Sequence, residues 1–180
     1  VKKDYDEDLV GLIDFYKEKG YRDARIVSDT LIRNKNGNID LKIALEEGKR
    51  YYFGDIRFLG NSVYNDRVLN QVLGIKKGDV YNQKLLTKRV SSDDDAISNL
   101  YYNHGYVFSH IEPTEVNIDG DSIDLEMRIV EGQQAHLNKV RINGNDRLYE
   151  NVVRRELRTK PGDLFSKESL QRSARELATM

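Results

Sequence analysis

Three groups of residues have side chains that take part in chemistry in other proteins: a run of acids, the histidines and a set of arginines. The acids are the consecutive residues Asp93, Asp94 and Asp95. Carboxylates bind cations, but consecutive side chains on a helix point in different directions, and calcium loops place their ligands at alternate positions. We therefore interpret this run as a solvated face and predict no metal site there.

The histidines lack the spacing of a metal site. His104 is expected at a helix end, and His110 and His136 in separate strands, without the i, i+4 spacing by which one helix binds zinc. The chain contains no cysteine, which excludes disulfides and thiolate ligands. We expect no enzyme activity: no catalytic residue, no metal and no cofactor. A metal-dependent hydrolase that uses the histidines is the distant alternative.

The arginines Arg154, Arg155 and Arg158 are placed at helical spacing and form a local basic cluster. Such a cluster is either an exposed helix face or a docking surface for an acidic partner. The chain as a whole has a net charge of -1 with both signs interspersed, which argues against a nucleic-acid binder. A protein partner is therefore the functional alternative for these three residues.

An internal repeat positions these residues along the chain. Tyr52–Asn61 and His136–Asn145 share an alternating pattern and a closing Gly-Asn, and they lie 84 residues apart (145 minus 61). Ile39-Asp40-Leu41 recurs at the same offset as Ile123-Asp124-Leu125. The chain is thus predicted to contain the C-terminal half of one unit (1–50), a complete unit (51–133) and the N-terminal part of the next (134–180).

Apolar periodicity and turn residues predict the elements of each unit. A helix that starts among acids near Asp4 ends at Gly20, and the turn Asn36-Gly37 joins the two strands that follow. Strands are predicted at Tyr21–Arg33, Ile39–Glu46, Tyr52–Leu59, Val107–Ile118, Ser122–Val130 and Leu137–Ile142, and helices around Val68–Leu73, Asn82–Tyr101, Val152–Leu157 and Leu170–Leu177.

The segment Ser91–Asp95 interrupts the apolar stripe of the longest of the helices in the complete unit. It is either an extra solvated turn of one helix, or a break after which Ser92 caps a new helix together with Asp95. We predict a continuous helix, because neither glycine nor proline intervenes.

The complete unit has the order β-α-α-β-β and belongs to the α+β class. Each strand has one strongly apolar side, which predicts a three-stranded mixed sheet with two helices on one face. The last two strands form a hairpin and the first joins the last, so the strand with Pro113 is a free edge. An edge strand offers unpaired N–H and C=O groups to any extended chain. The candidate binding residues on this edge are Val107, Phe108, Ser109, His110 and Ile111.

Several motifs recur in register. A strand closes with Gly-Asn, Gly-Asp follows the first helix, the second helix ends in Tyr-x-x-x-Gly-Tyr, and Glu-Gly closes each unit. The copies are Gly60-Asn61 and Gly144-Asn145, Gly78-Asp79 and Gly162-Asp163, Tyr16–Tyr21 and Tyr101–Tyr106, and Glu47-Gly48 and Glu131-Gly132. In this combination the chain resembles the polypeptide-transport-associated (POTRA) repeats of BamA-type outer-membrane protein assembly factors.

This resemblance implies a bacterial periplasmic scaffold that is attached to its own C-terminal outer-membrane β-barrel. The family receives unfolded outer-membrane proteins for insertion and docks accessory lipoproteins, which assigns the edge strand to the clients and Arg154, Arg155 and Arg158 to a partner. The segment Asn151–Arg158 resembles the repeat nearest the barrel. The repeats of a two-partner secretion transporter, or of another barrel-associated translocase, are the related alternative.

The junctions between the units, Glu47–Arg50 and Glu131–Gln134, are short and polar. Because little apolar surface is available there, we predict hinged units with a few preferred angles.

Overall fold

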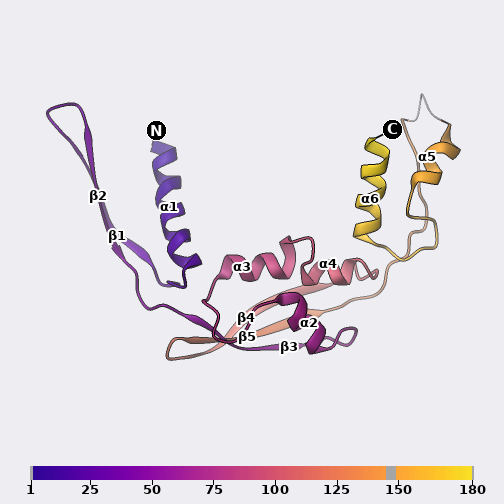
Figure 1. Ribbon diagram of the computed structural model, residues 1–180, viewed down its shortest axis with the longest axis horizontal. Helices are drawn as coiled ribbons and strands as arrows, with labels where there is room; N and C mark the ends of the chain where they lie inside the picture. The colour runs from indigo at the N-terminus through magenta and orange to yellow at the C-terminus, as the bar shows by residue number, and fades with distance from the viewer. Residues whose placement is uncertain (1, 145–148, 180) are drawn as a thin grey trace. The chain divides into compact units, whose positions relative to one another are not determined.

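The structure is a computed structural model that describes residues 2–144 and 149–179. Asn145, which closes the Gly-Asn motif of the last unit, lies outside these residues. Figure 1 traces the elements in order: α1 (Lys2–Glu18), β1 (Arg25–Arg33), β2 (Ile39–Glu46), β3 (Tyr52–Leu59), α2 (Asp66–Leu73), α3 (Gln83–Thr87), the π-helix η1 (Lys88–Ser92), α4 (Ile97–Tyr102), β4 (His110–Asp119), β5 (Ser122–Val130), α5 (Glu150–Glu156) and α6 (Lys167–Ala178).

The strands form a two-stranded antiparallel ribbon, β1-β2, and a three-stranded sheet of order β3-β5-β4. The N–H of Tyr52 donates to the carbonyl of Asp121 at 2.8 Å, and the N–H of Asp55 donates to the Asp124 carboxylate at 2.7 Å. Residue numbers on β3 and β5 thus rise together, so these strands are parallel, while β4 and β5 form a hairpin. The predicted mixed sheet, with the Pro113 strand at its edge, is confirmed.

One face of the three-stranded sheet is buried. On β5, Ile123, Leu125 and Met127 have exposed fractions of 0%, 1% and 0%. Their counterparts 84 residues earlier on β2, Ile39, Leu41 and Ile43, have exposed fractions of 63%, 48% and 36%. The same sequence pattern is therefore buried in the three-stranded sheet of the complete unit. It is exposed in the two-stranded ribbon, where no third strand joins in the described residues.

The described residues pack into two compact units, and each contains residues from neighbouring predicted repeats. The first unit comprises the described residues up to Arg57 together with Gly74–Thr87 and Pro113–Glu126. The second comprises Phe58–Leu73, Lys88–Glu112 and the described residues from Met127 onward. Each unit thus includes one of the two junctions.

The predicted continuous helix Asn82–Tyr101 is wrong, because it is interrupted after η1 and resumes only at Ile97. Arg89 in η1 donates through Nε to the carbonyl of Leu73 at 3.1 Å, at the C-terminal end of α2, and pairs with Asp95 at 2.7 Å. The side chain of Asn99 donates to the carbonyl of Asp93 at 2.7 Å. The contact from Asn99 occupies a backbone carbonyl of the interrupted segment, and the contacts of Arg89 hold η1 against the end of α2 and against Asp95.

The alternative cap is also absent, since the residue that precedes α4 is Ala96 and provides no side-chain cap. The acidic run is not simply a solvated face either. Asp95 and Asp93 both pair with Arg89, at 2.7 and 3.5 Å.

The predicted strand Leu137–Ile142 is not formed. Only an isolated bridge joins His136 to Leu164, and Leu137 exchanges hydrogen bonds with Gly162 and Asp163. In the complete unit the equivalent strand β3 pairs with β5, and within 149–179 no counterpart of β5 is present to pair with this segment. A strand without a neighbour lacks the ladder that defines it.

The repeated Glu-Gly motif has a structural role in closing the unit. The carboxylate of Glu131 accepts hydrogen bonds from the N–H groups of Ser62 and Val63, at 2.8 and 2.9 Å, and from the Tyr101 hydroxyl at 3.1 Å. In the preceding unit, burial and the nearby Glu47 carboxylate raise the pKa of the Tyr16 phenol. Glu131 of this motif therefore connects the end of the β4-β5 hairpin to Tyr101 in α4 and to the segment that follows β3.

Candidate functional site

β3 and β4 are the two edge strands of the three-stranded sheet, because in the described residues each pairs with β5 alone. The start of β3 also forms an isolated bridge from Tyr52 to Val80, so the outer edge of β4 is the candidate site. It begins at His110, three residues later than predicted. His110 and Ile111 lie in β4, whereas Val107 and Phe108 lie in a turn and Ser109 follows that turn. The edge available to an extended chain is therefore His110–Asp119, and three of the five predicted residues lie outside it.

The turn has a local cause. Gly105 has φ of +88°, the left-handed region that glycine favours. The N–H of Val107 then donates to the carbonyl of Gly105 at 2.9 Å, and the N–H of Ser109 to that of Tyr106 at 3.1 Å. Because these two N–H groups are bonded inside the turn, they are not available to an extended chain at the edge of the sheet.

The side chains of β4 alternate between the core and solvent near its start. Ile111 is buried, and Glu112 and Val116 are exposed. Glu115 is partly buried: it pairs with Arg22 at 2.6 Å and accepts a hydrogen bond from the Tyr81 hydroxyl at 2.7 Å. Burial raises the pKa of the Tyr81 phenol, and the bond to Glu115 raises it further, so the phenol stays protonated as the donor.

The three arginines do not form one free cluster. Arg154 pairs with Glu150 one turn earlier in α5, and Arg155 with Glu156 at 3.1 Å. Arg158 lies beyond α5 and its guanidinium binds Glu176 of α6 at 2.8 Å, which raises the pKa of Arg158. The backbone N–H of Arg158 also donates to Ser173 Oγ at 2.9 Å. Arg158 thus connects α5 to α6, and Arg154 and Arg155 remain the candidates on the exposed face.

The histidines lie apart, and His104 and His136 bond to the backbone. Nδ1 of His104 lies 2.9 Å from the carbonyl of Leu100, and Nδ1 of His136 lies 3.1 Å from that of Gly162. Across the part of the chain that the structure describes, no group of three or more His, Cys, Asp or Glu side chains has the arrangement of a metal site.

Each junction is joined by a short chain of backbone hydrogen bonds that the sequence did not indicate. The N–H of Tyr51 donates to the carbonyl of Gly20 at 2.8 Å, and the carbonyl of Tyr51 accepts from the N–H of Tyr81 at 2.9 Å. At the second junction the equivalent bonds run from Ala135 to Gly105 and from Phe165 to Ala135, at 2.8 and 2.9 Å. Both junctions are therefore built from the same backbone positions.

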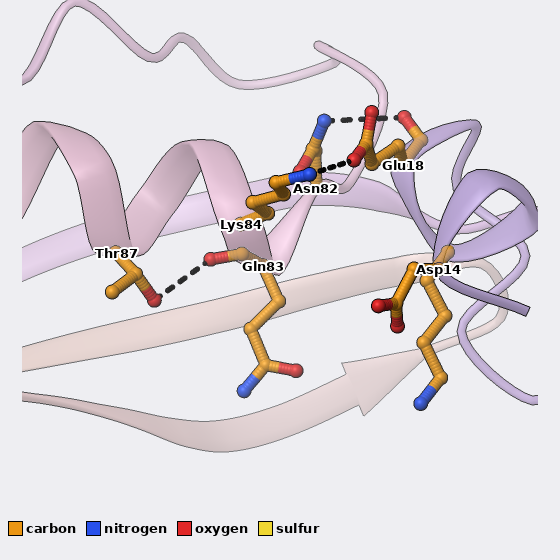
Figure 2. Close-up of a pocket in the computed structure, with 7 residues that line it drawn as sticks. Asp14, Glu18, Asn82, Gln83, Lys84 and Thr87 are labelled. Carbon is orange, nitrogen blue, oxygen red and sulfur yellow. Dashed lines mark hydrogen bonds and ion pairs between the residues drawn. The ribbon is translucent and has the colours of Figure 1, made fainter. Parts of the chain in front are cut away.

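A groove of about 270 Å³ that is lined by polar and charged residues lies beside the first junction, between α1 and the start of α3. Lys84 Nζ lies 2.6 Å from the Glu18 carboxylate, and the Asn82 side chain donates to the carbonyl of Glu18 at 3.2 Å. Figure 2 marks both contacts with dashed lines. The lining residues are Asp14, Lys17, Glu18, Asn82, Gln83, Lys84 and Thr87.

The fold defines a class of tandem α+β modules whose small sheets have edge strands such as β4, which pairs on one side only. More particularly, the chain belongs to the POTRA family: the family model described as surface antigen variable number repeat matches residues 51–132 and 135–180. Within the described residues, no helix is both long and apolar enough to cross a membrane.

The chain is similar to curated BamA proteins. It is 30% identical over 169 residues to the outer membrane protein assembly factor BamA of Nitratidesulfovibrio vulgaris, and 28% identical over 170 residues to that of Neisseria meningitidis serogroup B. Each alignment covers 93% of this chain and 21% of the relative, so the chain spans about a fifth of these proteins. The crystal structure of Haemophilus influenzae BamA POTRA3-5 has the same fold, with a TM-score of 0.70 at 18% identity, and covers 97% of this chain and 68% of that one.

Proposed function

We propose that this chain is a periplasmic scaffold of a BamA-type outer-membrane assembly factor, and that it receives unfolded outer-membrane β-barrel proteins by strand addition to the outer edge of β4. The open edge His110–Asp119 in a chain of the POTRA family is the observation that carries the proposal. Its own membrane β-barrel follows this segment of the protein, and accessory lipoproteins of the assembly complex dock on the repeats.

Strand addition suits a scaffold with many clients. The outer edge of β4 presents backbone N–H and C=O groups that an extended chain of any sequence can pair with. Each such bond contributes about 0.5–1.5 kcal/mol, so a few of them give weak, reversible binding. Pro113 removes one donor, and Glu112 places a charge on the exposed side of the strand, and both features limit permanent pairing.

The test is site-specific photo-crosslinking in the full-length protein that contains this chain. We expect a photoreactive amino acid at Glu112 or Val116, both exposed in β4, to form adducts with an unfolded outer-membrane β-barrel protein. The matched controls are Asn70 and Gln71, which are exposed on α2. Adducts that form chiefly from the α2 positions would refute strand addition at β4.

We further propose that Arg154 and Arg155 dock an acidic accessory lipoprotein. Reversing both charges to glutamate is expected to weaken co-purification of that lipoprotein, mainly through a slower association rate and a smaller salt dependence. Arg172→Glu is the matched control, because Arg172 also pairs with a glutamate one turn away on an exposed helix face. Arg158 is left unchanged, since its loss would disturb the contact of α5 with α6. Unchanged recovery of every accessory subunit would reject this site.

A further inference from the structure

The first junction carries two ion pairs that connect the segment before Tyr51 to the complete unit. Lys84 Nζ lies 2.6 Å from the Glu18 carboxylate, and the Arg22 guanidinium lies 2.6 Å from that of Glu115. All four side chains are partly exposed to solvent. Exposed pairs of this kind are sensitive to salt, because the Debye length falls from about 30 Å at 0.01 M to about 3 Å at 1 M.

The second junction replaces these ion pairs by contacts to amide side chains. At the position equivalent to Glu18 stands Asn103, whose Oδ1 accepts from the N–H of Glu168 at 2.9 Å. At the position equivalent to Arg22 stands the apolar Val107. The ammonium of Lys167 donates to Oδ1 of Asn99 at 2.8 Å.

Asn99 links the second junction to the interrupted helix. Asn99 is only 4% exposed, and its Nδ2 donates to the carbonyls of Asp93 and Asp94, at 2.7 and 3.3 Å. The extra segment between η1 and α4 therefore fixes the amide that Lys167 binds. A contact to a buried, neutral partner is screened by salt much less than an exposed ion pair.

We propose that the two junctions are of different kinds. The first is an ionic clasp that loosens as ionic strength rises, and the second is an amide lock that keeps its stability over the same range and depends on the segment 93–96. The backbone bonds are common to both junctions, so the side chains alone set the difference. As ionic strength rises, a protein with this arrangement opens first at the junction Glu47–Arg50.

Amide hydrogen exchange in the 180-residue chain tests this proposal, because each junction has its own reporter amides. The N–H of Tyr51 bonds across the first junction and that of Ala135 across the second, while the N–H of Phe53, bonded to Asp79, is a reference inside the complete unit. Between about 0.05 M and about 1 M salt, we expect the protection of Tyr51 relative to Phe53 to fall about two- to tenfold, as expected for loss of exposed ion pairs. The protection of Ala135 relative to Phe53 should stay within about twofold.

Two sets of variants assign the effect. Arg22→Gln combined with Lys84→Gln should give Tyr51 its high-salt protection at every salt concentration, whereas Lys77→Gln, which removes the ion pair to Asp55 within the unit, should leave the salt response intact. Asn99→Ala should lower the protection of Ala135 at every salt concentration. Because Asn99 is buried, Lys167→Met provides the same test without a change in the core. Equal salt responses of Tyr51 and Ala135, or no response at either amide, would overturn the proposal.

Discussion

Leu125→Ala is expected to lower the free energy of unfolding of the complete unit by about 2–5 kcal/mol, the usual range for a fully buried leucine. The same substitution at Leu41, its counterpart on β2, is expected to change the free energy of unfolding by less than about 0.5 kcal/mol. The two residues occupy the same position in the repeat. Leu125 is buried on the three-stranded sheet, whereas Leu41 is exposed on the two-stranded ribbon. The difference between the two changes in unfolding free energy therefore measures what burial of the leucine contributes at one position of the repeat.

Native-state hydrogen exchange of the β5 amides is the suitable measurement for both variants, because several repeats need not unfold in one step. Leu125→Ala should accelerate exchange throughout β5, and Leu41→Ala should leave β5 unchanged. A similar effect of the two substitutions on β5 would show that burial at the repeat position does not decide stability.

Glu131→Gln is expected to destabilise the complete unit at pH 7 by about 1.5–3 kcal/mol, the range for a hydrogen bond to a charged group. Burial alone would raise the pKa of the Glu131 carboxyl, but the bonds from Ser62, Val63 and Tyr101 outweigh burial and hold the pKa below its ordinary value of 4.5. A lowered pKa in the folded state stabilises the fold above the pKa of the unfolded chain, and this contribution is lost as pH falls through the folded value.

The pH dependence gives this prediction its control. The stability gap between the wild-type chain and Glu131→Gln should narrow as pH falls below about 4.5, the ordinary glutamate pKa from which the folded value is lowered. Glu112→Gln, at an exposed position of β4, should cost less than about 0.5 kcal/mol at any pH. A gap that stays constant from pH 7 down to acid unfolding would mean that the charge of Glu131 contributes nothing.

The strands that sequence alone predicted correctly are those with local signals at both ends. β2, β3 and β5 begin and end as predicted, because apolar alternation runs between turn residues such as Asn36-Gly37, Gly60-Asn61 and Asp119-Gly120. The edge position of β4 followed from Pro113 and the hairpin. These features depend on neighbouring residues, which a sequence displays directly.

The features that sequence did not predict depend on side-chain contacts and strand partners that follow no periodic pattern. The interruption after η1 arises from Arg89 binding the end of α2 and Asn99 binding Asp93, and neither contact leaves a periodic trace. The segment Leu137–Ile142 has strand-like alternation but no partner strand in the described residues. The spacing of the arginines showed that they are neighbours, but not that Arg158 is bound by Glu176 of another helix.

Strand addition to β4 is tested most directly by amide exchange of the isotopically labelled chain during titration with an unfolded outer-membrane β-barrel protein. Alternate N–H groups of a strand point to opposite edges, so the outward half of the amides in His110–Asp119 should slow their exchange as the client binds, while the amides of α2 and α6 keep their rates. Protection that appears on the helices and leaves every amide of β4 unchanged would contradict the proposed mechanism.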